Sequence, residues 1–330
     1  MRKIVIGILT CLTLLLLLSG CGSHTAPTQI EEPPPAPEEP PPEPALPDLP
    51  GAVFVSVENH PNARPQSGLD KADLVIEMDS EAGITRFLAL YYSEAAGEIG
   101  PVRSARSYFV QIVKAFDSPF AHAGGSEEAL LLLKTLKIKN LDEIYGSGAY
   151  FWRSRNRKMP HNLYTSTDLL VQGAEKKGYK LLPYSPLPEG TPTGGAETSA
   201  LSLKYANNKY YKYITEYRYD GNLYAKYVNG EPLLDSGGSQ IAAANVIVIV
   251  AQSKWLGNQD PPLTDIKIVG SGPAYYFTQG KIFTGEWKKA APGAHFQFTA
   301  GGETMQFSPG KTWINVIPSE SALDYITETK

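Results

Sequence analysis

The pattern of apolar and polar positions divides the chain into three zones. Ile4 to Leu18 is an almost unbroken apolar run, which Arg2 and Lys3 precede. A proline-rich acidic zone follows, and from about residue 51 short apolar segments alternate with polar turns. The first run, about 15 residues long, is shorter than the roughly 20 that a membrane-spanning helix needs. It fits a cleaved secretion signal, and we expect no other segment to cross a membrane because no other run is as long and apolar.

The third zone begins with strands and helices in alternation. Short apolar runs predict strands at 52–57, 73–79 and 84–92. An apolar stripe at helical spacing then predicts a helix with Ser104 as its N-cap. The stripe consists of Ala105, Tyr108, Phe109, Ile112, Val113 and Phe116. This mixture is typical of an α/β or α+β domain.

Two further helices are expected in the same domain. One should begin at Ser126, because two acidic residues follow it in what would be the first turn. The other should span 167–177 and stop at Gly178. The proline- and glycine-rich stretch 183–200 then breaks the pattern and predicts a linker between domains.

Beyond residue 200 the pattern is that of antiparallel strands. Runs at 211–219 and 224–228 flank Asp220-Gly221, a hairpin signal. Further strands are expected at 245–251, 275–277, 281–283, 296–299, 304–307 and 313–317. We therefore predict a signal peptide at 1–20, a tether at 21–50, an α/β or α+β domain at 51–182, the linker at 183–200 and a mostly-β antiparallel domain at 201–330.

Composition explains the tether and the charge. Residues 21–50 contain eleven prolines, six acidic residues and no lysine or arginine, which favours extended polyproline II geometry. The whole chain has a formal charge of −4. Without the two basic residues of the signal and the six acids of the tether, residues 51–330 are electrically neutral. Nucleic-acid binding normally leaves a basic footprint, so we expect no nucleic-acid partner.

Cysteine usage points to a lipid anchor. Leu18-Ser19-Gly20-Cys21 has the lipobox pattern of bacterial lipoproteins, in which the cysteine is acylated, for example with palmitate. The only other cysteine, Cys11, leaves with the signal. We therefore expect a protein anchored to the membrane through lipidated Cys21, on the extracytoplasmic face, without intrachain disulfides.

The hairpin between 73 and 92 suggests an ion pair. With a loop at 80–83, Glu77 lies opposite Arg86 on faces otherwise lined by apolar residues. An exposed cross-strand pair of opposite charge contributes about 0.2–1 kcal/mol. We predict a structural ion pair between these two residues, with a role in a site as the alternative.

Arg103 and Arg106 stand where the first helix is expected to start. Cations are unfavourable at a helix N-terminus, so a negative group should lie opposite them. That group could be a phosphate or carboxylate of a ligand, held by the guanidinium fork. It could equally be an acid of a neighbouring strand: Glu58, Glu77 or Glu81.

Other polar residues admit several chemistries. His60, His122 and His161 match no local metal motif, so we predict no metal site. The segment His122-Ala123-Gly124-Gly125-Ser126 suggests a nucleophile at Ser126, but it lacks the Gly-x-Ser-x-Gly elbow, and a helix cap explains Ser126 equally. The four tryptophans and 19 tyrosines could stack on sugar rings, although in hairpin strands such residues more often pack in the core.

Separated motifs carry a family resemblance. They are NHPNARPQSGL (59–69), ITRFLALY (84–91), GPVRSAR (100–106), HAGGS (122–126), FWR (151–153), PHNLYTS (160–166), GEWKK (285–289) and GKTWINVIP (310–318). On these motifs the chain resembles the YerB-like family of bacterial lipoproteins, whose function is unknown, from about residue 51 to 320. The resemblance implies a secreted, lipid-anchored protein of two domains, with no established catalytic residues and no established cofactor.

The sequence thus predicts a tethered binding protein rather than an enzyme, without a cofactor. We expect it to bind an anionic or carbohydrate-containing component of the cell envelope, or an envelope partner protein. The alternatives are an envelope hydrolase or transferase with a His/Ser/acid site, and a scaffold that docks a partner through its β domain. The predicted binding residues are Asn59, His60, Arg64, Arg103, Arg106, His122, Arg153, His161 and Asn162.

Overall fold

The computed structural model describes residues 48–185, 187–257 and 260–327. The predicted signal peptide, Cys21 and nearly all of the tether lie outside the described residues. Within those ranges, no helix combines the length and the apolar character that crossing a bilayer requires. The sequence prediction of a mixed α and β first part and a mostly antiparallel second part is confirmed.

The first part builds half of a large sheet. Its strands are β1 (Val53–Glu58), β2 (Leu74–Glu81), β3 (Ile84–Tyr91), β4 (Phe120–His122) and β5 (Asn140–Asp142). β3 pairs antiparallel with both β1 and β2, whereas β1, β4 and β5 run parallel. These elements confirm the strands predicted at 52–57, 73–79 and 84–92.

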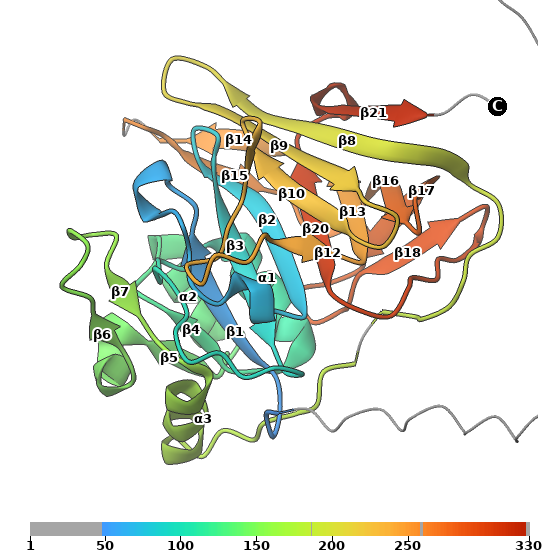
Figure 1. Cartoon of the computed structure of the whole chain (residues 1–330). Coiled ribbons are helices and arrows are strands. Elements are labelled where there is room, and N and C mark those ends of the chain that lie inside the picture. The colour runs from blue at the N-terminus through green and yellow to red at the C-terminus, as the bar shows by residue number, and fades with distance from the viewer. Residues whose placement is uncertain (1–47, 186, 258–259, 328–330) are drawn as a thin grey trace, which may run out of the picture. The chain divides into compact units, whose positions relative to one another are not determined.

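The same sheet continues into the second part of the chain. β20 (Thr312–Ile317) pairs in parallel with β2, and on its other side with β13 (Asn245–Val250). The sheet then extends through β16 (Gly270–Thr278), β17 (Lys281–Lys289), β18 (Gln297–Ala300) and β19 (Glu303–Thr304), all antiparallel. The described residues accordingly form one unit, in which strands from both parts share a continuous sheet (Figure 1).

A second sheet covers one face of the first and is joined to it where Ala196 and Glu197 pair with β17. It consists of β21 (Leu323–Thr327), β8 (Ala196–Asn207), β9 (Lys212–Tyr219), β10 (Tyr224–Val228), β11 (Glu231–Pro232) and β12 (Ala242–Ala243). The last five residues of the predicted linker 183–200 thus belong to β8. Two short hairpins complete the strands: β14 (Ser253–Leu256) with β15 (Leu263–Ile266), and β6 (Trp152–Arg153) with β7 (Leu163–Tyr164).

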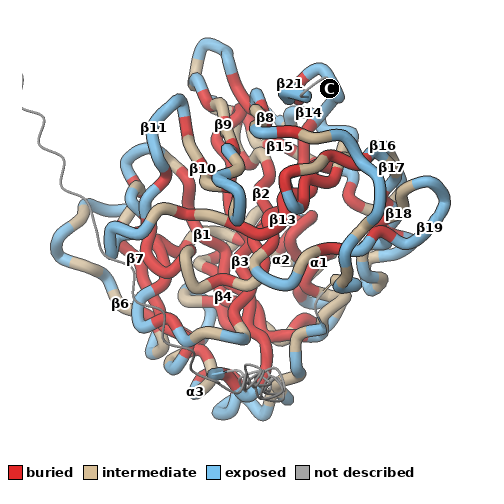
Figure 2. The backbone as a smooth tube through the Cα atoms, turned by 45° about the vertical axis from the view of Figure 1, so that its right-hand side comes forward, coloured by how far each residue is buried: buried red, intermediate tan, exposed pale blue. Residues whose placement is uncertain are grey.

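Helices lie on both faces of the main sheet. α1 (Ser107–Phe116) and α2 (Glu127–Thr135) pack on the face that carries Ile76, Leu88 and Ile314, and α3 (Thr167–Lys176) packs on the opposite face with the second sheet. Short helical turns are η1 (Pro61–Ala63), η2 (Leu69–Lys71), η3 (Glu143–Ser147), η4 (Gly148–Tyr150) and η5 (Glu320–Ala322). Figure 2 shows the central strands buried and the outer loops exposed, as expected for a sheet covered on both faces.

The helix starts were predicted with mixed success. Ser126 caps α2 as expected, because its side chain accepts from the backbone N–H of Ala129. The prediction that Ser104 caps the first helix is wrong, since the helix begins at Ser107 and Arg106 occupies the cap position. Residues 103–105 stay extended because Ala105 bridges Gly125 and the Arg103 N–H bonds to Ser56 O.

The hairpin register differs by one residue from the prediction. The loop is Ala82-Gly83 and a bulge lies between Asp79 and Glu81, so that Glu77 pairs with Phe87 and Met78 with Arg86. A shift of one residue moves a side chain to the other face of a sheet. The predicted Glu77–Arg86 ion pair is therefore wrong, because the two side chains lie on opposite faces.

Candidate functional site

Arg103 and His161 share one buried carboxylate. Glu58, the last residue of β1, lies with Oε1 3.1 Å from Arg103 Nε and with Oε2 3.0 Å from His161 Nδ1. The pKa of Arg103 is lowered by burial and by the nearby charges of Arg86 and Arg153, against the attraction of Glu58 and Glu81. The negative group opposite Arg103 is thus an internal acid, one of the two alternatives that the sequence left open.

Arg106 has a similar arrangement with a second acid. Glu81 Oε1 lies 2.5 Å from Arg106 Nη2 and 3.0 Å from Arg86 Nη2. Burial opposes ionisation of Glu81, but the charges of Arg86 and Arg106 outweigh it and lower its pKa. Burial lowers the pKa of Arg106 to about 10, helped by the charge of Arg86. Two guanidinium groups therefore share one carboxylate.

The start of α1 opens into a groove of about 610 Å³ that Arg106 lines with Ser107 and Ser126. No side chain caps α1. The first-turn N–H groups of a helix have no partner within the helix, and they favour negative charge. The groove therefore gives an anion a route to Arg106, although Glu127 and Glu128 on its wall oppose one.

His60 and Arg64 lie beside the first acid. The His60 ring stacks on His161 with 4.9 Å between ring centroids. Burial, and after it the charge of His161, lowers the pKa of His60, and the charges of Arg103 and Arg64 act in the same direction. Arg64 bonds to Asn59 through Nε and Nη2. Because Asn59 is fully buried, it positions Arg64 instead of meeting a ligand itself.

Arg153 and Asn162 form the remaining edge. Arg153 Nη1 donates to Asn162 Oδ1 over 3.1 Å, and its Nη2 lies 3.4 Å from Glu143 Oε1. Asn162 in turn donates to Ser154 O and holds the loop between β6 and β7. We name Arg64, Arg86, Arg103, Arg106 and Arg153 the arginine cluster. Four of its five guanidinium groups share three carboxylates, those of Glu58, Glu81 and Glu143.

His122 does not belong to this surface. It is completely buried at the end of β4, where Nδ1 lies 2.8 Å from Gly124 O and Nε2 lies 2.7 Å from Asn140 Oδ1. Both ring nitrogens have protein partners, and burial lowers the pKa of His122. Its prediction as a ligand-binding residue is wrong, because the parallel strands β4 and β5 enclose the ring.

The Ser126 hydroxyl acts as a helix cap and has no hydrogen bond to His122. It caps α2, and the His122 nitrogens bond elsewhere. A nucleophilic serine needs a base within hydrogen-bond reach. The pair His122 and Ser126 therefore does not form a nucleophile and base.

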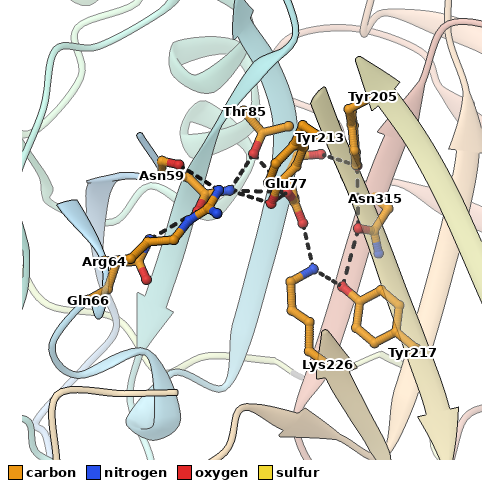
Figure 3. A network of polar contacts seen from close by, with 10 residues as sticks. All are labelled: Asn59, Arg64, Gln66, Glu77, Thr85, Tyr205, Tyr213, Tyr217, Lys226 and Asn315. Carbon is orange, nitrogen blue, oxygen red and sulfur yellow. Dashed lines mark hydrogen bonds and ion pairs between the residues drawn. The ribbon is translucent and has the colours of Figure 1, made fainter. Parts of the chain in front are cut away.

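The sequence prediction missed a buried polar network between the two parts of the chain. Figure 3 shows Glu77 of β2 facing Lys226 of β10, with Nζ 2.7 Å from Oε2 and no exposure of either side chain. Glu77 also accepts from Thr85 and Tyr213, and Lys226 donates to Tyr217. Burial lowers the pKa of Lys226 to about 8. The alternation of inward and outward side chains along β10 could have predicted that Lys226 is buried, because position 226 faces inward with Tyr224 and Val228.

Comparison with known proteins places both parts in one family. The model described as "Protein of unknown function (DUF3048) N-terminal domain" matches residues 43–180, and its "C-terminal domain" counterpart matches 201–314. The chain is 37% identical over 275 residues to "Putative lipoprotein YerB" of Bacillus subtilis (strain 168), covering 82% of each protein. The crystal structure of YerB from Bacillus subtilis superposes with a TM-score of 0.76 at 37% identity, over 84% of this chain and 94% of that one.

Proposed function

The chain belongs to the DUF3048 family and is similar to "Putative lipoprotein YerB", and on this premise we propose that it is an envelope-binding lipoprotein. In this proposal a lipid on Cys21 holds it at the extracytoplasmic face of the membrane. The arginine cluster then binds an anionic, carbohydrate-containing component of the envelope. The lipobox and the acidic, proline-rich tether support the first half of the proposal.

The observation that carries the second half is the shared use of carboxylates. Glu81 serves both Arg86 and Arg106, and Glu58 serves both Arg103 and His161. A guanidinium group has five donors and binds phosphate or carboxylate with two of them at once. A group that shares an acid can keep donors for a ligand: Arg103 meets Glu58 through Nε, and its two Nη groups are then the donors that a ligand would meet.

Partial burial strengthens this arrangement. Arg86 and Arg106 are almost completely buried, and Arg103 is about three-quarters buried. Electrostatic attraction to an anion is greater where water is excluded than at an open surface. The internal acids explain why the arginines can be buried there at all, because an unpaired buried charge is costly.

The test is binding by the full chain in detergent, measured by calorimetry. The probes are a tetrasaccharide of N-acetylglucosamine and N-acetylmuramic acid, which carries lactyl carboxylates, and poly(glycerol phosphate). Arg103→Gln should lower the affinity for the probe that binds by about tenfold, which corresponds to about 1.4 kcal/mol.

Arg218→Gln is the matched control, because Arg218 is half-exposed in β9 and paired only with Glu216. It should bind like the wild type. Unchanged unfolding midpoints would show that both variants remain folded. The proposal fails if neither probe binds to the wild type, or if Arg103→Gln and Arg218→Gln bind equally well.

A further inference from the structure

A line of aromatic rings leads away from the arginine cluster. It starts with the stacked pair His161 and His60, and Tyr211 meets His60 edge-on with 6.1 Å between centroids. Tyr210 follows at 6.5 Å from Tyr211, and Trp255 at 6.4 Å from Tyr210. We name these five rings the aromatic strip.

Residues from both parts of the chain form the aromatic strip. Its histidines follow β1 and precede β7, its tyrosines lie in the turn between β8 and β9, and Trp255 lies in β14. Figure 1 shows the β8–β9 turn, the β14–β15 hairpin and the segment after β1 at the same end of the molecule. The ring contacts agree with this view, so the strip is a surface that exists only when both parts are assembled.

The outer rings are not core packing residues. Trp255 is 53% exposed, and Tyr210 and Tyr211 are half-buried, whereas Tyr213 and Tyr217 of the adjoining strand are completely buried. A tryptophan left half in water forgoes burial of a large apolar surface. Exposed aromatic rings in series are typical of surfaces that bind a ligand with flat apolar faces.

Local bonds fix the strip before any ligand arrives. The Asn208 side chain accepts from the backbone N–H groups of Tyr210 and Tyr211, over 2.8 and 3.1 Å. The same side chain donates to Ala82 O in the β2–β3 turn. The backbone that carries the two tyrosines is therefore held against the first part of the chain, which reduces the entropy that binding would cost.

The two neighbouring surfaces define one ligand chemistry. The faces of sugar rings carry C–H groups that pack on aromatic rings, whereas their acidic substituents need cations. At the inner end of the strip, Arg103 and His161 share Glu58, and Arg64 lies over the Tyr213 ring. The strip thus leads from exposed rings to the guanidinium groups of the arginine cluster.

We propose that the aromatic strip is the sugar-binding half of the site, and that the ligand is an oligosaccharide bearing carboxylate or phosphate groups. This inference rests on the proposed function and specifies its ligand class. The sugar rings stack on Tyr211, Tyr210 and Trp255 while an acidic group of the same chain meets the arginine cluster. A polyanion without sugar rings would use the arginine cluster alone.

Three probes separate the two halves of the site. The N-acetylmuramic-acid tetrasaccharide has rings and charge, N,N′,N″,N‴-tetraacetylchitotetraose has rings without charge, and poly(glycerol phosphate) has charge without rings. Calorimetry with the full chain in detergent gives each affinity. Trp255→Ala and Tyr210→Ala should each weaken tetrasaccharide binding by about tenfold and leave poly(glycerol phosphate) binding unchanged.

Tyr145→Ala is the matched control, because Tyr145 is 66% exposed and lies outside the strip. It should leave all affinities unchanged. In one outcome, Arg103→Gln weakens tetrasaccharide binding while Trp255→Ala and Tyr210→Ala leave it unchanged. That result would overturn the proposal that the aromatic strip binds sugar, and it would leave the proposed function standing. Equal loss of poly(glycerol phosphate) binding in Trp255→Ala would also overturn the sugar-binding proposal. Absence of binding to every probe would overturn the proposed function as well.

Discussion

Lys226 Nζ lies 2.7 Å from Glu77 Oε2, and neither side chain is exposed to solvent. Lys226 also lies against the rings of Tyr217 and Trp313, at 4.3 and 4.4 Å from their centroids. β2 supplies Glu77, and the second sheet supplies Lys226 and Tyr217. The pair therefore joins the two parts of the chain at a place where both side chains are shielded from solvent.

Lys226→Ala should strongly destabilise the protein. Removal of one member of a buried ion pair leaves the other charge uncompensated, which costs about 3–5 kcal/mol. Urea unfolding of the full chain measures this loss. Lys204→Ala in β8 is the control, since Lys204 is exposed. Equal unfolding free energies for the two variants would contradict a structural role for the pair.

Asp79 should make stability depend on pH. Burial raises its pKa to about 6, against the hydrogen bonds that it accepts from Gly83 N and Thr264 Oγ1. Between pH 4 and 6 the folded protein keeps this proton while the unfolded chain has lost it, so stability falls as pH rises through that window. Asp79→Asn removes this titration.

The measurement is the unfolding free energy of the wild type relative to Asp79→Asn. This difference in unfolding free energy should fall by up to about 3 kcal/mol between pH 4 and pH 7. A difference that stays constant over this range would show that Asp79 is ionised throughout. Because both proteins carry all other acids, those titrations cancel in the comparison.

Gly83→Ala should weaken the contact between the β2–β3 turn and β8. Gly83 has a φ of +100°, and a Cβ there would lie 2.3 Å from the Cβ of Ala206. We expect a loss of about 1–3 kcal/mol from strain and overpacking. Gly97→Ala is the control, because a Cβ at that position meets no atom within 4 Å. A thermal unfolding midpoint as high as that of the control would count against the close approach.

Cys21→Ala should release the protein from the membrane. Without the thiol, the lipid of the proposed anchor cannot be attached at position 21. Metabolic labelling with a palmitate analogue, followed by membrane fractionation, measures both effects. Cys11→Ala should keep the label and the membrane fraction. Labelling that persists in Cys21→Ala would place the lipid elsewhere.

Local signals predicted most elements correctly. The stripe on α1 and the cap at Ser126 depend on neighbouring residues, and both are found. The predicted Glu77–Arg86 ion pair depended on the register of the β2–β3 hairpin. A bulge of one residue shifts that register, so that the two side chains lie on opposite faces of the sheet. Nothing in the sequence around Ser80 indicates that bulge, because a bulge depends on how the strand meets its neighbours.

For the same reason, the sequence indicated the positions of only some residues of the candidate site. Arginines near one helix start suggested a cluster, and Arg103 and Arg106 do lie near other cations and shared acids. His122 was grouped with them because glycines follow it in the sequence, but its ring is enclosed by β4 and β5. Lys226 was missed because a charged residue in a hairpin is usually exposed, and its partner is 149 residues away.

The parallel pairing of β2 with β20 has a consequence for how the protein is made. Val75 of β2 lies beside Trp313 of β20. β2 is synthesised early, but it can pair with β20 only after the end of the chain has been synthesised. Contacts of such high sequence separation fold slowly, because loop closure must precede any gain from them. Until residue 317 has emerged, one edge of β2 stays open and prone to mispairing. A chain that is truncated before β20 should therefore be a substrate for chaperones and proteases instead of a stable fragment.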